Sequence, residues 1–81
     1  MSVVVNTGVD SSITTLAGLA AIETSALTLD SIKLFYNAAD DEVQAWQLRA
    51  GTDATVAGSI QRPDDYNAGS NARVWYRVPL V

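Results

Sequence analysis

Two short runs of the sequence alternate between apolar and polar side chains: Val43-Gln44-Ala45-Trp46-Gln47-Leu48-Arg49 and Ala72-Arg73-Val74-Trp75-Tyr76-Arg77-Val78. Both runs are rich in Val, Trp or Tyr, and each is followed by a breaker, Gly51 after the first and Pro79 after the second. Alternation with a period of two, bounded by Gly, Asn or Pro, is typical of half-buried strands. We therefore predict that these runs are the central strands of a small β-domain.

The alternation also divides each strand into two faces. On the first run Trp46 and Leu48 share a face, and on the second run Val74 and Tyr76 share a face. We expect these faces to be buried against apolar side chains from the rest of the chain. The full expected core is Leu16, Leu19, Ile32, Leu34, Trp46, Leu48, Val74 and Tyr76.

Further elements are expected before and between the two runs. Ser12 is suited to cap a short amphipathic helix over residues 13–22, where apolar side chains recur at helical spacing. Residues 31–36 and 55–60 have the pattern of two further strands. The predicted fold is mainly β with one short N-terminal amphipathic helix, in a small antiparallel β-sandwich or barrel-like domain that covers residues 1–81.

The length and composition limit what this domain can do alone. With 81 residues, a domain buries only about 60–65% of its unfolded surface, so it is marginally stable as a monomer. Cys is absent, which excludes a disulfide, and His is absent, which leaves carboxylates as the plausible metal ligands. Small domains without such cross-links commonly gain stability from oligomerisation. We therefore expect a homo-oligomer.

Charge and hydropathy bear on the possible partners. The formal net charge is −4 at pH 7, which argues against nucleic acid, because a duplex requires a basic face. The longest uncharged stretch, between Asp10 and Glu23, is too short and too polar to span a bilayer. The N-terminus lacks the basic region and long apolar segment of a signal peptide. We expect a protein that is made in the cytosol and that binds neither nucleic acid nor membrane.

Enzymatic chemistry has little support in the sequence. The absence of His and Cys removes the usual general bases and nucleophiles. The carboxylate run Asp40-Asp41-Glu42 lacks the alternating ligands and central Gly of a calcium loop, so we interpret it as a solvated turn. We therefore expect no catalytic residue, no cofactor and no metal site.

Side chains opposite the expected core are the candidates for a partner surface. Phe35 and Trp75 fall on those opposite faces, where a monomer would expose them. Arg73 and Arg77 flank Trp75, and Trp and Arg are enriched at binding hot spots. Stacking of guanidinium on indole within the chain is the alternative for this ladder. Tyr66 adds an aromatic side chain from the loop before the last strand.

The run Val3-Val4-Val5 is β-branched and uncharged, and a turn signal follows it. Such a run forms an edge strand that needs pairing, either with a neighbouring subunit or with the sheet of its own chain. The candidate oligomer and partner interface therefore comprises Val3, Val4, Val5, Phe35, Tyr66, Arg73, Trp75 and Arg77.

The order of features also resembles a known family. A Thr/Leu/Ala helix leads into strands, a Gly-Thr-Asp-Ala-Thr segment precedes a Gly-Ser-Ile element, and a Trp-Tyr-Arg-Val run follows a Pro-Asp loop. This order is similar to the small β-modules of tailed-bacteriophage virion proteins, in which a T-x-x-L-x-x-L helix precedes a closing x-W-x-R/x-V. The matching residues are Thr15, Leu16, Leu19, Trp46, Gly51, Thr52, Ala54, Thr55, Gly58, Trp75 and Arg77.

The resemblance covers roughly residues 13–78 and implies a homotrimer that binds phage capsid or tail proteins in the virion. A fibre would need a shaft and a receptor-binding tip after Val81, so a capsid decoration protein (cement or head-fibre) is the expected function. One alternative is an anchoring or adaptor module of a tail fibre or tailspike. Another is a host-receptor or glycan-binding knob that stacks sugars on Tyr66, Trp75 and Tyr76. A small bacterial β-protein with a different role is the remaining alternative.

Overall fold

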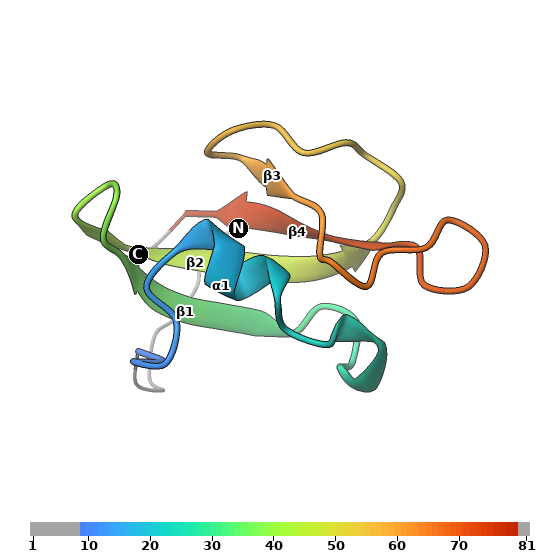
Figure 1. The fold of residues 1–81 in the computed structure, drawn as a ribbon, viewed down its shortest axis with the longest axis horizontal. Helices are drawn as coiled ribbons and strands as arrows, with labels where there is room; N and C mark the ends of the chain where they lie inside the picture. Colours follow the sequence, from blue (N-terminus) through green and yellow to red (C-terminus); the bar gives the residue numbers. More distant parts are fainter. Residues whose placement is uncertain (1–8, 80–81) are drawn as a thin grey trace.

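The structure, a computed structural model, describes residues 9–79 as an antiparallel sheet with one short helix over one face (Figure 1). The strands are β1 (Ile32–Asn37), β2 (Glu42–Ala50), β3 (Ile60–Gln61) and β4 (Arg73–Val78). Their order across the sheet is β1-β2-β4-β3, and all neighbouring pairs are antiparallel. The two Trp-containing runs are therefore the central strands, as predicted. The run Val3-Val4-Val5 lies outside the described residues.

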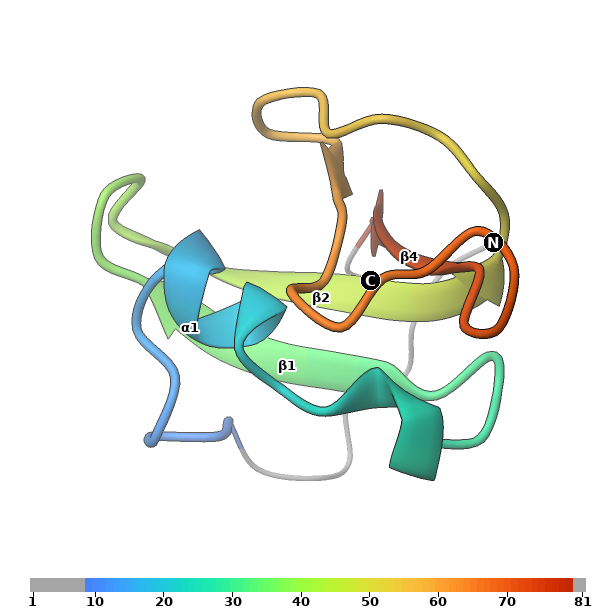
Figure 2. The same ribbon diagram turned by 45° about the vertical axis from the view of Figure 1, so that its right-hand side comes forward.

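Two short helical elements precede the sheet, and α1 lies across one of its faces (Figure 2). They are α1 (Leu16–Ala20) and the 3₁₀ turn η1 (Thr24–Ala26). The helix begins after Thr15, whose hydroxyl oxygen accepts a hydrogen bond from the Gly18 N–H at 3.0 Å. The predicted cap at Ser12 is wrong, because the Ser12 N–H and hydroxyl donate to the Asp10 carboxylate at 3.0 and 2.6 Å. The helix is thus shorter than expected, which agrees with the low helix propensity of Thr and Gly in this stretch.

The strand predicted over residues 55–60 is also shorter than expected. Only Ile60–Gln61 forms β3, paired with β4. The residues before it make a tight turn in which the Val56 N–H donates to the Ile60 carbonyl at 2.9 Å. Gly58 has a φ of +82° in this turn, a conformation that favours glycine. The turn brings this part of the chain toward α1.

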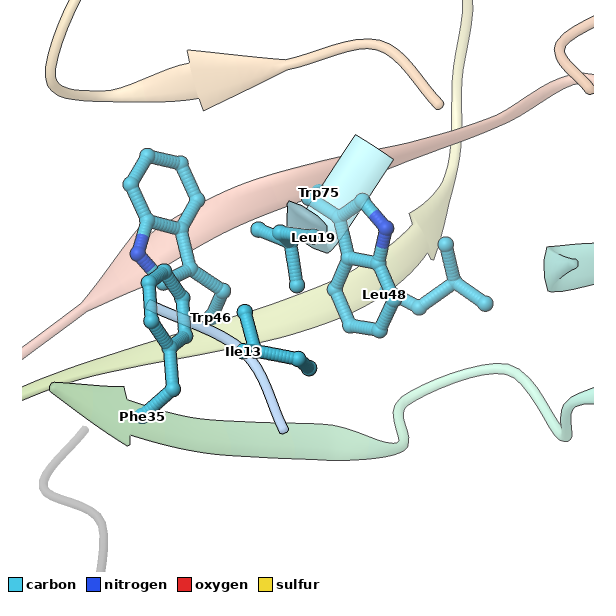
Figure 3. Packing of buried hydrophobic residues seen from close by; sticks show 6 residues of the cluster. All are labelled: Ile13, Leu19, Phe35, Trp46, Leu48 and Trp75. Carbon is cyan, nitrogen blue, oxygen red and sulfur yellow. The ribbon is translucent and has the colours of Figure 1, made fainter. Parts of the chain in front are cut away.

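The core lies between α1 and the sheet (Figure 3). Its members, each at most 5% exposed, are Ile13, Leu19, Phe35, Trp46, Leu48 and Trp75. Leu48 and Trp75 are register partners on β2 and β4, so their side chains lie on the same face of the sheet. Because a buried aromatic side chain removes about 150–250 Å² from water, Phe35, Trp46 and Trp75 dominate this small core.

The burial pattern corrects part of the assignment of strand faces on β1 and β4, where both faces contribute buried residues. Phe35 and Trp75 are 0% exposed, so the prediction that a monomer would expose them is wrong. Conversely, Ile32 is exposed, and Tyr76 and Leu16 are only partly buried. The other expected core residues are indeed buried: Leu19, Leu34, Trp46, Leu48 and Val74.

Long cationic side chains explain why the buried faces read as polar in the sequence. Lys33, Arg73 and Arg77 alternate with the two buried aromatic residues on β1 and β4. Such side chains lay their apolar stems along the core and carry the charge to a polar group at its edge. The Lys33 Nζ lies 3.2 Å from the Asp10 Oδ2, and the Arg77 Nη2 lies 2.8 Å from the Glu42 Oε2.

Candidate functional site

Phe35 and Trp75 offer no surface to a partner, since both side chains lie inside the core between α1 and the sheet (Figure 3). Their assignment to an oligomer interface is therefore corrected. The remaining described candidates, Arg73, Arg77 and Tyr66, lie on different parts of the molecule, and each has contacts within the chain.

Arg73 binds the backbone of the η1 segment. Its Nη1 donates to the carbonyl oxygen of Thr24 at 3.0 Å and to that of Leu27. The Thr24 side chain is fully buried, and its Oγ1 donates to the Asp65 Oδ1 at 2.7 Å and accepts from the Asn71 Nδ2 at 3.1 Å. We call Thr24, Asp65, Asn71 and Arg73 the Thr24 cluster. It ties the η1 segment to the loop before β4, so Arg73 has a structural role.

Arg77 is exposed and lies at the opposite end of β4. Its Nη2 donates to the Glu42 Oε2 at 2.8 Å. The pKa of Glu42 is lowered from 4.5, first by a hydrogen bond from the Gln44 side chain and then by the one from Arg77. Because both partners of this ion pair are exposed, the pair adds little to stability.

A buried carboxamide next to this ion pair was not predicted as a structural centre. The Gln44 Oε1 accepts from the Asn37 Nδ2 at 3.2 Å and from the Trp46 Nε1 at 3.1 Å. Its Nε2 donates to the Asp40 Oδ2 at 2.8 Å and to the Glu42 Oε2 at 3.1 Å. We call these residues the Gln44 network. The sequence signal for it was a Gln on the strand face that also carries Trp46, a position where an apolar side chain is expected.

The aromatic residues considered for glycan stacking are largely engaged. The Arg62 guanidinium lies 4.1 Å from the centre of the Tyr66 ring, and the Arg49 guanidinium lies 5.1 Å from the centre of the Tyr76 ring. The Tyr76 hydroxyl also donates to the Asp53 Oδ2 at 2.6 Å, and this hydrogen bond raises the pKa of the phenol. With Trp75 buried, this set of residues presents no shared stacking surface.

Exposed apolar side chains occur instead on the face of β1 and β2 that points away from α1. Ile32 is 43% exposed, Tyr36 is 40% exposed and Val43 is 37% exposed. Tyr36 and Val43 are register partners, and Ile32 lies on the same face of β1. We call these three residues the outer stripe. The sequence alternation put Val43 on the face of β2 opposite Trp46, and its exposure agrees with that. On β1, Ile32 and Leu34 were both expected in the core, and only Leu34 is buried.

A pocket of about 430 Å³ lies beside α1, where the β1–β2 turn and the turn before β3 approach the helix. Its lining residues are Thr15, Leu16, Asn37, Ala39, Asp40, Ala57 and Gly58. These residues come from three separate stretches of the chain, so no local motif could have predicted the pocket.

Within residues 9–79, no group of three or more carboxylates lies close enough together to hold a metal ion. No helix in the same range is long and apolar enough to cross a membrane.

Comparison of the chain with known protein families, with curated proteins and with solved structures gave no match.

Proposed function

We propose that this chain is a non-enzymatic structural protein of a tailed-bacteriophage virion, a homotrimer that binds the capsid surface as a decoration protein. The proposal includes the sandwich-like or barrel-like architecture that the sequence led us to expect for the assembled domain. The observation that carries the assembly role is the outer stripe, and the choice of a phage virion follows from the family resemblance.

The outer stripe has the character of a contact surface. Isolated exposed apolar side chains are common on monomers and need no explanation. Here, however, Tyr36 and Val43 are register partners on neighbouring strands. Ile32 lies on the same face of β1, separated from Tyr36 by Leu34, which is 7% exposed. A neighbouring subunit or a capsid protein that covers this face would remove the exposed apolar area from water, which stabilises the complex.

Four of the residues that carry the resemblance have structural roles in this chain. Thr15 caps α1, and Leu19, Trp46 and Trp75 form much of the core. These motif residues start the helix and pack it on the aromatic side chains of the sheet. This supports the assignment of the chain to the class of small virion β-modules.

Sedimentation with phage capsids that lack decoration protein tests the proposal. The wild-type chain should co-sediment with the capsids, and Val43→Glu should not, because it puts a charge into the outer stripe. Val56→Glu is the matched control, since Val56 is 51% exposed but lies in the turn before β3. Binding to host cells or glycans without capsid binding would favour the knob alternative, and binding to purified tails alone would favour the anchoring alternative.

Multi-angle light scattering tests the trimer. The full-length chain should have the mass of three copies, and its melting temperature should rise with protein concentration because folding and association are linked. A monomer across the concentration range, with a constant melting temperature, contradicts the oligomeric part of the proposal.

A further inference from the structure

The pocket beside α1 combines apolar walls with a carboxylate. Its walls include the side chains of Leu16, Ala39 and Ala57, and its polar groups belong to Thr15, Asn37 and Asp40. At about 430 Å³ it is of a size that accepts a small ligand or a single side chain.

The Asn37 carboxamide is already engaged within the chain. Its Oδ1 accepts from the Ala39 N–H at 3.1 Å, and its Nδ2 donates to Gln44. The group is also buried, so it forms part of the pocket floor. Asp40 is exposed, and its Oδ2 accepts one hydrogen bond from the Gln44 Nε2. Asp40 is therefore the pocket residue that can contact a charged ligand.

The positive charges of the chain are engaged at other sites. Lys33 pairs with Asp10 and Arg77 pairs with Glu42. The other three basic residues make the contacts described above: Arg49 with Tyr76, Arg62 with Tyr66, and Arg73 with the carbonyls of the η1 segment. Among residues 9–79, no cation lies within ion-pair distance of Asp40. The carboxylate at the pocket is thus uncompensated by the described chain, and Asp41 and Glu42 follow it in the sequence.

This combination selects a ligand with an apolar stem and a cationic end. A sugar is a poor fit because no aromatic ring lines the pocket, and a nucleic acid or other anion is repelled by the Asp40 carboxylate. Lysine and arginine side chains have the required form, since their methylene stems pack on apolar surface while the charged head stays at the edge.

We infer that the pocket beside α1 binds a lysine or arginine side chain presented by a partner protein, with the aliphatic stem against Leu16 and Ala57 and the charge at Asp40. The inference goes beyond the proposed function, because it uses a different surface from the outer stripe.

Amide NMR titration of the full chain tests the inference with three small probes. Nα-acetyl-lysine methylamide and Nα-acetyl-arginine methylamide carry the cation, and Nα-acetyl-norleucine methylamide carries the same kind of stem without it. At millimolar concentration the two cationic probes should shift the amide signals of Ala39, Ala57 and Gly58, and the norleucine probe should bind more weakly. Equal shifts with all three probes would overturn the role of charge, and no shift with any probe would overturn the site.

Two variants and a control sharpen the test. Asp40→Asn keeps an oxygen that can accept from Gln44, so the fold should persist while the affinity for the lysine probe falls about threefold, as expected for an exposed ion pair. Ala57→Trp should fill the pocket and abolish the shifts. Asp64→Asn removes an exposed carboxylate outside the pocket and should leave the affinity unchanged. If Asp40→Asn binds the probe as well as the wild type does, the assignment is wrong, whatever the capsid sedimentation shows.

Discussion

The two tryptophans of the core are buried to the same extent but are bonded differently. Trp46 and Trp75 are both 0% exposed and lie on the same face of neighbouring strands. The Trp46 indole N–H donates to the Gln44 Oε1 at 3.1 Å, within a carboxamide network in which Gln44 makes four hydrogen bonds. The Trp75 indole N–H is buried and finds no acceptor among the described residues.

The difference shows that the two ends of the core are stabilised in different ways. A buried donor without a partner costs about 1–3 kcal/mol, so at Trp75 the burial of the ring outweighs that cost. At Trp46 the ring and its polar atom are both accommodated, and the network also connects the β1–β2 turn to the sheet. The Trp75 end is instead closed by loops that the Thr24 cluster holds together.

The largest expected effect comes from removing either ring. Trp46→Ala and Trp75→Ala should each lower the free energy of unfolding by about 3–5 kcal/mol, through lost burial and the cavity that remains. Urea denaturation followed by circular dichroism measures this loss, with the exposed Val56→Ala as a control within about 0.5 kcal/mol of wild type. A Trp75→Ala variant that stays fully folded but no longer self-associates would contradict the placement of Trp75 in the core.

Exchange of each tryptophan for phenylalanine separates the ring from its polar atom. Trp46→Phe leaves the Gln44 Oε1 with one donor fewer, whereas Trp75→Phe removes a donor that had no partner. Both exchanges shrink the ring by a similar amount, so Trp46→Phe should be the more costly by about 1–2 kcal/mol. The same urea experiment compares them. Equal losses would mean that the Trp75 N–H has an acceptor in solution.

The sequence predicts the central strands well because their signal is local. The run at 43–49 became β2 (Glu42–Ala50), and the run at 72–78 became β4 (Arg73–Val78). Alternation does not say which face of a strand meets the helix when both faces carry apolar side chains. On β4 one face has Trp75 and the other has Val74 and Tyr76, so either face could be the one packed against the helix.

The contacts of Arg73 and the pocket beside α1 were less predictable, because both depend on contacts between distant parts of the chain. The Arg73 guanidinium binds the carbonyl of Thr24, 49 residues before it, and so is used inside the molecule. The acidic turn was predicted to be solvated, and Asp40, Asp41 and Glu42 are exposed. The prediction did not include that Asp40 lines a pocket together with Leu16 and Ala57. No local sequence pattern predicts that the three segments around residues 15–16, 37–40 and 57–58 line one pocket.

A smaller effect is expected at the loop end of the core, where Thr24 has its hydroxyl fully buried. Thr24→Val keeps the shape of the side chain but removes the donor to Asp65 and the acceptor for Asn71. The free energy of unfolding should fall by about 2 kcal/mol, because two hydrogen bonds with a usual net value of about 1 kcal/mol each are lost. Thermal denaturation, with the exposed Thr28→Val as control, measures the difference. An unchanged stability would show that the Thr24 cluster does not hold the loops.

The smallest effect distinguishes the two ends by their response to acid and salt. Burial raises the pKa of Asp65, but hydrogen bonds from the Thr24 hydroxyl and from the Ser25 and Thr24 N–H groups outweigh it, so the pKa lies below its ordinary 3.8. At the other end, hydrogen bonds from Gln44 and then Arg77 hold the pKa of Glu42 below 4.5. A carboxylate with a lowered folded-state pKa contributes stability that is present above its ordinary pKa and is lost as the pH falls through the folded value.

Both contributions should therefore be complete at neutral pH and disappear in the acid range, from below 4.5 for Glu42 and from below 3.8 for Asp65. Salt should separate them, because the Arg77 contribution at Glu42 is an exposed charge pair that counter-ions screen, whereas the donors to Asp65 are neutral.

Carboxyl-carbon NMR titration at low and high salt should show the Glu42 pKa moving toward 4.5 in salt while the Asp65 pKa stays low. Asp65→Asn should flatten the acid limb of the stability curve at both salt concentrations, and Glu42→Gln should flatten it more at low salt than at high salt. An Asp65 pKa at or above 3.8 would mean that the hydrogen bonds from the η1 segment do not form, and the two ends of the core would then differ only in the bonding of their indole groups.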